Sequence, residues 1–237
     1  MTPGIIELLG FGSQGWGALL LKAAAITLSA AICGFLLGSV LGVGGATLKL
    51  ARSYPLRLIG QFYTTVFRGI PEILVVYLFY FGGSVVLTKA MSTGGFTGFY
   101  SLPAFVTGAI SVGIVSGAYQ TEAYRSAFLR LDRGQLEAGA SCGMSKLLLL
   151  RRIIAPQTLR FALPALGNVW QSALKETSLL SVIGLVELLR QAGTAAGSTR
   201  QPFLFYGVAA LLFLIIGRVT GHLLMRLENR LAKPWRR

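Results

Sequence analysis

Apolar residues follow one another in long runs along this chain, and short polar or basic segments separate the runs. The first run begins near Ala18 and holds to Leu48, which is longer than the about 20 residues that a helix needs to cross a bilayer. The pattern predicts five membrane-spanning helices, roughly at residues 18–48, 57–88, 101–123, 158–180 and 202–225. We therefore expect one all-α integral membrane domain over residues 1–237.

Glycine recurs every fourth residue in the first run, at Gly34, Gly38 and Gly42. In membrane helices this spacing allows two backbones to approach closely, which predicts a tight contact with another helix. Glycine is also frequent in membrane helices in general. The spacing is therefore equally compatible with no special contact.

The second run is too long for one simple span at the rise of an α-helix, and the segment Arg-Gly-Ile-Pro-Glu at 68–72 interrupts it. A proline suits the first turn of a helix, and an acidic residue there is stabilised by the helix dipole. We therefore expect one helix that ends near Phe67 and a main span that begins at Pro71.

Composition agrees with an integral membrane protein. Of 237 residues, 54% are hydrophobic and only 13% are charged, and the mean hydropathy is +0.66, whereas soluble domains carry about 25% charged residues. The net charge of +14 would suggest nucleic-acid binding in a soluble protein. Here basic and aromatic residues do not interleave on one polar face, so we expect a lipid bilayer and no nucleic acid as partner.

Lysine and arginine are unevenly distributed between the two sets of connecting segments. Most of them lie in segments that would share one side of the membrane, 49–68, 125–160 and 226–237. The connecting segments of the opposite side hold only Lys89, Arg190 and Arg200. Because cytoplasmic loops are rich in Lys and Arg, we expect the N-terminus outside and the C-terminus inside.

The segment 126–157, which this orientation puts in the cytoplasm, predicts two short helices joined at a sharp corner. Asp132 can cap the first helix, and Gly143 can adopt the left-handed conformation that ends it. A second helix over Ser145–Ile154 would end before Pro156, because the residue before a proline is disfavoured in the α conformation. A rigid, bent element of this kind can act as a lever on a partner.

The same segment carries a spaced motif, namely Glu137-Ala138-Gly139, Gly143, Ile153 and Pro156. The motif resembles the EAA motif of ABC importer permeases, in which Glu-Ala-Ala is followed by three residues, Gly, nine residues and Ile-x-Leu-Pro. The chain departs from that pattern at Gly139 and at Ala155. Neither departure removes the acidic residue or the corner.

Three further segments, 68–72, 117–122 and 174–179, resemble signatures of polar amino-acid permeases within that family. The resemblance covers roughly residues 26–231. It extends to the permease subunits for histidine, lysine, arginine and ornithine and to those for octopine and nopaline.

The resemblance implies the transmembrane domain of a type I ABC importer in the bacterial inner membrane. Two such permease subunits pair, often as two different chains, two ATPase subunits bind ATP and Mg²⁺ on the cytoplasmic side, and a periplasmic solute-binding protein docks on the other side. The motif residues Glu137, Ala138, Gly139, Gly143, Ile153 and Pro156 would contact the ATPase. The chain has no Gly-x4-Gly-Lys-Ser/Thr phosphate loop, so we expect a non-enzymatic subunit without a cofactor of its own.

Charged residues near or within the apolar runs are candidates for a substrate pathway or gate, because charges in a membrane usually face a cavity or a partner. They are Arg68, Glu72, Glu122, Lys175 and Glu176. Each of these residues can also have a purely structural role. Glu72 can stabilise a helix N-terminus or pair with Arg68. Glu122 can pair with Arg125 three residues away. Lys175 and Glu176 can instead cap the outer end of a span.

A carboxylate such as Glu72 in the pathway would suit a cationic cargo, so we expect polar, basic amino acids or opines as substrates. The alternative function is an ion-coupled secondary transporter, which requires inverted repeats and ion sites at the midplane, and the sequence has no convincing internal repeat. The two cysteines, Cys33 and Cys142, lack the spacing of a metal site. We therefore expect no bound metal.

Overall fold

The computed structural model describes residues 4–12, 15–95 and 97–232, and within these ranges the chain is helical without a strand. The α-helices are α1 (Ile5–Leu9), α2 (Gly17–Leu50), α3 (Tyr54–Gly69), α4 (Glu72–Tyr77), α5 (Gly83–Thr93), α6 (Ala104–Leu129), α7 (Arg133–Ser141), α8 (Lys146–Leu149), α9 (Ala155–Glu176), α10 (Leu188–Thr199) and α11 (Pro202–Ala232). Between them lie the π-helices η1 (Leu78–Gly82) and η2 (Leu150–Ile154) and the 3₁₀-helix η3 (Thr177–Ile183). The predicted all-α class is confirmed.

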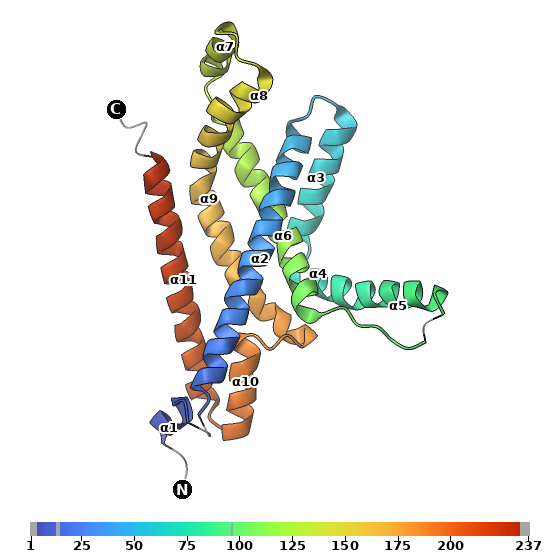
Figure 1. Cartoon of the computed structure of the whole chain (residues 1–237), viewed down its shortest axis with the longest axis vertical. Coiled ribbons are helices and arrows are strands. Elements are labelled where there is room, and N and C mark those ends of the chain that lie inside the picture. The colour runs from blue at the N-terminus through green and yellow to red at the C-terminus, as the bar shows by residue number, and fades with distance from the viewer. Residues whose placement is uncertain (1–3, 13–14, 96, 233–237) are drawn as a thin grey trace.

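The helices α2 and α6 pack side by side at the centre of the molecule (Figure 1). A Cβ atom added at Gly34 would lie 2.7 Å from Cγ1 of Val112, and one added at Gly42 would lie 2.8 Å from Cβ of Gln120. The two backbones approach this closely only because these positions lack side chains. Of the two interpretations of the glycine spacing, the close helix contact is therefore the correct one.

Helix α6 is buried along most of its length, and small side chains make this possible. Its buried hydroxyls bond to their own helix: Ser111 Oγ donates to the Thr107 carbonyl at 2.9 Å, and Thr121 Oγ1 donates to the Gly117 carbonyl at 2.8 Å. Such bonds satisfy polar groups that water does not reach. The hydroxyls make α6 less apolar than its neighbours without making its burial costly.

Three helical segments of the described residues are long and apolar enough to cross a bilayer. They are Gly17–Leu50, Glu72–Thr93 and Pro202–Arg230. A fourth candidate is the bent pair Lys146–Ile183 and Leu188–Thr199, whose two parts meet at 52°. Helix α6 is absent from this set because its interior is rich in glycine and hydroxyl residues, so the predicted number of five spans stays a prediction.

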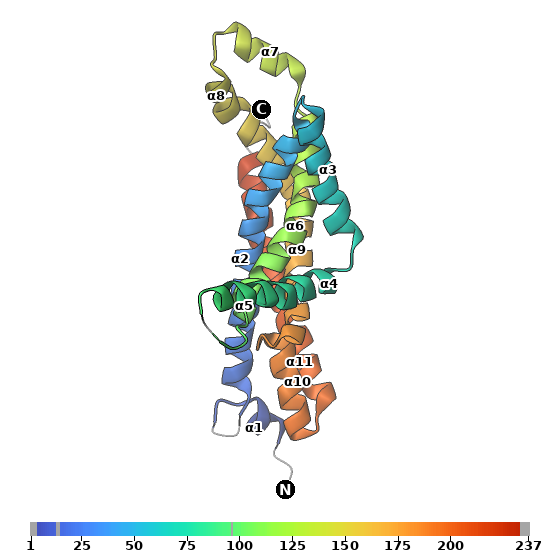
Figure 2. The ribbon, with the colours of Figure 1, turned by 90° about the vertical axis from the view of Figure 1, so that its right-hand side faces the viewer.

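The break in the second apolar run lies close to its predicted position. Helix α3 ends at Gly69, and Pro71 immediately precedes α4. Helix α3 returns along α2, whereas α4, η1 and α5 run across the direction of α2 and α6 (Figures 1 and 2). The predicted span 57–88 therefore contains parts of two helices with different directions, and Glu72 stands at the turn between them.

Helix α11 packs against α9 and α10 and leaves much of its apolar surface exposed. Trp170 Nε1 on α9 donates to Thr220 Oγ1 on α11 at 2.9 Å, while Phe203, Leu211 and Leu214 are exposed. A continuous apolar surface of this kind belongs in a bilayer or against another membrane subunit. The end of the basic tail, residues 233–237, lies outside the described residues.

Candidate functional site

The segment with the EAA-like motif forms a protruding corner at one end of the molecule. Asp132 caps α7 by accepting a hydrogen bond from the Gly134 amide at 2.9 Å. Gly143 then has φ +78°, in the left-handed region that favours glycine. Ser145 caps α8 by accepting a bond from the Leu148 amide at 3.3 Å. Figures 1 and 2 show α7 beyond the ends of α2 and α3, and α8 leads from it back to α9, so the predicted two-helix corner is confirmed.

Gly139 lies where α7 packs closely against the helix that follows the bend. Gly139 is buried, and an added Cβ atom would lie 2.6 Å from Leu149 Cδ1 and 3.1 Å from Ile153 Cδ1. The departure from the second alanine of the family motif thus lets η2 pack directly against α7. Glu137 and Ala138 are exposed on the same helix and are free for contact with a partner.

The predicted end of the second short helix before Pro156 is wrong. Helix α8 passes into η2, and η2 passes into α9, which carries Pro156 in its first turn. The Ala155 amide donates to the Leu150 carbonyl five residues back, as in a π-turn. This wider turn puts the proline, which has no amide hydrogen, at a position where the helix tolerates it. The corner is therefore continuous with α9.

A side-chain contact that the sequence did not indicate joins the corner to α9 a second time. Gln157 Nε2 donates to Gln135 Oε1 at 2.7 Å, and Gln157 is buried. Because Gln135 lies on α7, a displacement of α7 acts on α9 through this bond as well as through η2. The corner and α9 are therefore joined at two places.

Two of the predicted pathway residues, Glu72 and Glu176, are partly buried and lie near each other. Glu72 lies at the start of α4 and Glu176 at the end of α9, next to η3, which packs against α4, so the two acidic side chains are close enough to interact electrostatically. Oε2 of Glu176 is buried and has no hydrogen-bond partner within the described residues. Two neighbouring carboxyl groups that have no cationic partner among the described ion pairs form a site that favours a positively charged ligand. The alternative pairing of Glu72 with Arg68 does not occur among the described ion pairs.

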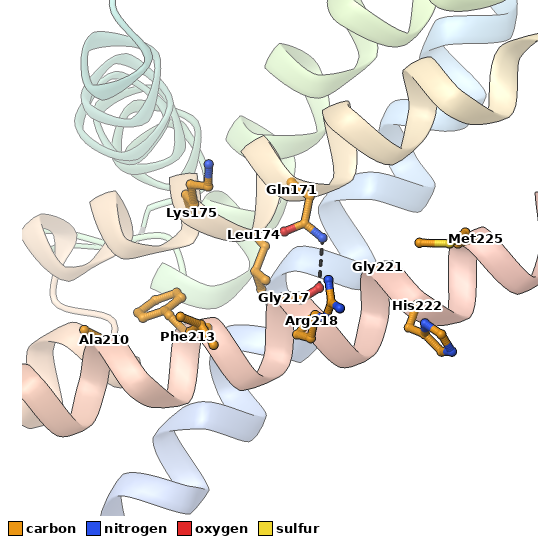
Figure 3. Close-up of a pocket in the computed structure, with 11 residues that line it drawn as sticks. Gln171, Leu174, Lys175, Ala210, Phe213, Gly217, Arg218, Gly221, His222 and Met225 are labelled. Atoms are coloured by element: carbon orange, nitrogen blue, oxygen red, sulfur yellow. Dashed lines mark hydrogen bonds between the residues drawn. The ribbon is translucent and has the colours of Figure 1, made fainter.

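Lys175 belongs to a different surface from its neighbour Glu176. It lines a cavity of about 840 Å³ between α9 and α11, together with Gln171, Arg218 and His222 (Figure 3). Gln171 Nε2 donates to the Gly217 carbonyl across this cavity at 3.0 Å. Consecutive residues on a helix point in different directions, so only Glu176 of this pair lies near Glu72.

The remaining two predicted residues, Glu122 and Arg68, lie in a polar cluster of α2, α3 and α6. Glu122 pairs with Arg125, whose NH1 lies 3.6 Å from Oε2, as the i,i+3 spacing predicted. It also pairs with the ammonium group of Lys49 on α2, which donates a second bond to Thr64 Oγ1 at 2.9 Å. From the sequence, Lys49 is expected only as one basic residue of the connecting segment 49–68, because its partner is 73 positions away.

Comparison with known proteins decides the family. Residues 34–231 match the model of the family described as binding-protein-dependent transport system inner membrane component. The chain belongs to this family. It is 50% identical over 234 residues to the octopine transport system permease protein of Rhizobium meliloti, covering 99% of both chains.

Other relatives extend the comparison to basic amino acids. The histidine/lysine/arginine/ornithine transport system permease protein of Escherichia coli (strain K12) is 35% identical, covering 91% of this chain and 94% of the relative. The fold matches the crystal structure of an amino acid ABC transporter with histidines, with a TM-score of 0.77, 29% identity, and coverage of 97% of this chain and 100% of that one.

This permease therefore has the type I ABC permease fold and is a multi-pass membrane protein. It is a transport subunit and not an enzyme, and importers of this family also contain ATPase and substrate-binding components. The secondary-transporter alternative finds no support among the relatives.

Proposed function

We propose that this permease carries cationic amino acids or opines across the bacterial inner membrane, and that the carboxyl pair Glu72–Glu176 receives the cationic group. The buried oxygen of Glu176, which lacks a hydrogen-bond partner within the described residues and lies near a second acidic side chain, carries this proposal. A guanidinium or ammonium group would supply the missing donors and offset the repulsion between the two acids. The substrates after which the relatives are named, octopine and the basic amino acids, all carry such a group.

We infer that the corner is the contact with the ATPase, which holds ATP and Mg²⁺ itself. Glu137 and Ala138 supply the exposed contact, Gly143 the bend, and Ile153 with Pro156 the junction to α9. The connection of α7 to α9 at two places supports this role, because α9 ends at Glu176. A displacement of the corner by the ATPase would thus move one half of the carboxyl pair, and transport would follow by alternating access.

The membrane arrangement that we propose keeps five spans, with the N-terminus outside and the C-terminus in the cytoplasm. In support, α1 and α10 lie at the end of the molecule opposite α7 and α8 (Figure 1). A periplasmic solute-binding protein would dock at the α1 and α10 end. The exposed apolar surface of α11 suits lipid or a second permease chain, and we propose a heterodimer in keeping with the resemblance.

The proposed substrate is tested by uptake into proteoliposomes that hold the assembled importer, its ATPase and its binding protein. We expect Glu72→Gln and Glu176→Gln to reduce arginine and octopine uptake by about tenfold or more, because each change removes a charge from the pair. Glu228→Gln on α11 is the matched control and should keep normal uptake. Normal uptake in both Glu72→Gln and Glu176→Gln would contradict the assignment of the cationic group to this pair.

A further inference from the structure

A second polar cavity, of about 360 Å³, lies between α2, α3 and α6. Its lining includes Lys49, Thr64, Arg68, Tyr119 and Glu122. Gly69 also lines the cavity and is three residues from Glu72. The cavity therefore borders the turn between α3 and α4 that precedes Glu72. Lys49 is the residue before the last of α2, and Glu122 belongs to the C-terminal third of α6. The C-terminal ends of both helices lie on the α7 side of the molecule (Figure 1). The cavity thus borders the turn before Glu72 and includes residues of the C-terminal parts of α2 and α6.

The charges at this cavity do not balance within the described residues. Glu122 is the one carboxylate of the lining, and both Lys49 and Arg125 contact it. Arg68 faces the same cavity and has no carboxylate partner among the described ion pairs. The surplus of positive charge favours an anionic ligand here, in contrast to the carboxyl pair nearby.

The positive groups are held in an orientation that leaves donors free. The guanidinium carbon of Arg68 lies 5.1 Å from the centre of the Tyr119 ring, an arrangement in which the ring stabilises the cation through its face. A guanidinium placed over a ring face can still offer N–H groups to a ligand, and its N–H edge matches a carboxylate with two parallel hydrogen bonds. Lys49 has three N–H donors, of which Thr64 and Glu122 take two.

We infer that this cavity binds a carboxylate of the transported substrate, through Arg68 and the third N–H donor of Lys49. This inference rests on the proposed function, because the cationic end of the same substrate would lie at Glu72 and Glu176. The two sites together select compounds that carry both a cation and a carboxylate, and they disfavour amines that lack the carboxylate. Tyr119 is a positioning residue, since it acts by holding Arg68.

Equilibrium binding to the nucleotide-free importer in lipid nanodiscs, without binding protein, tests the inference with arginine and agmatine, which is arginine without its carboxylate. We expect Arg68→Gln to weaken arginine binding by about tenfold or more, through loss of a bidentate pair, and to leave agmatine binding unchanged. The matched control is Arg57→Gln, which removes a stacked arginine of the same helix, 5.7 Å from the Tyr54 ring centre and outside the cavity. It should change neither affinity.

Tyr119→Leu is a second variant, which keeps the charge of Arg68 and removes only the aromatic ring that the guanidinium group contacts. It should weaken arginine binding by a smaller factor and again spare agmatine. Equal weakening of both compounds by Arg68→Gln, or no weakening of either, would overturn the inference while the proposed substrate stands. A wild-type importer that binds neither compound would instead contradict the proposed substrate, and the inference with it.

Discussion

The corner formed by α7 and α8 and the polar cluster between α2, α3 and α6 are built in opposite ways. Every capping contact of the corner joins residues a few positions apart, such as Asp132 with Gly134 and Ser145 with Leu148. The interior contacts join distant residues, as Lys49 with Glu122 over 73 positions and Ser39 with Gln120 over 81. A corner stabilised by local bonds keeps its shape when the helices move, whereas contacts between helices change with that movement. The corner is thus suited to transmit a displacement and the interior to respond to one.

The largest effect is expected from a change at Gly143, because the bend of the corner depends on the left-handed conformation of this residue. Gly143→Pro should abolish nearly all ATP-driven uptake, because proline fixes φ near −65° and the native φ is +78°. Gly143→Asn is the control, since asparagine tolerates the left-handed region, and it should keep most of the uptake. Both variants are measured in proteoliposomes at equal amounts of assembled importer. Normal uptake by the proline variant would show that the bend is dispensable.

The close contact between α2 and α6 tests how tightly the interior is packed. Gly34→Ala should destabilise the permease by about 1–3 kcal/mol, because the new methyl group would meet the β-branched Val112 and the Ala109 carbonyl, neither of which can rotate away. Gly44→Ala on the same helix has nothing within 4 Å of the new Cβ and should not destabilise it. Thermal unfolding in detergent compares the two, and equal melting temperatures would contradict the packing described.

The ion pair across the interior should have a smaller effect. Glu122→Gln leaves the largely buried ammonium group of Lys49 without its carboxylate, at a cost of about 1–2 kcal/mol once the partial exposure of Glu122 is allowed for. Adding Lys49→Gln should restore part of the loss, because no unpaired charge then remains. The melting temperatures of the two single variants and the double variant form the measurement. Strictly additive losses would contradict a direct pairing.

The same contrast explains which features the sequence could predict. The cap at Asp132, the bend at Gly143 and the break before Glu72 depend on neighbouring residues, so their sequence signals were sufficient. The proximity of Glu72 to Glu176 and the partner of Lys49 depend on how distant helices pack, and a single sequence carries no direct signal for that. The continuous helix through Pro156 was missed because a π-turn accommodates the proline that ordinarily ends a helix.

The transmission of force through Glu137 is tested most directly by the number of ATP molecules hydrolysed for each substrate imported. We measure it in proteoliposomes for the wild-type importer, for Glu137→Lys, and for Glu228→Lys as a charge-matched control on α11. The account predicts that Glu137→Lys hydrolyses several times more ATP per substrate, while Glu228→Lys matches the wild type. An unchanged ratio with normal uptake in Glu137→Lys would contradict the assignment of the corner as the coupling element.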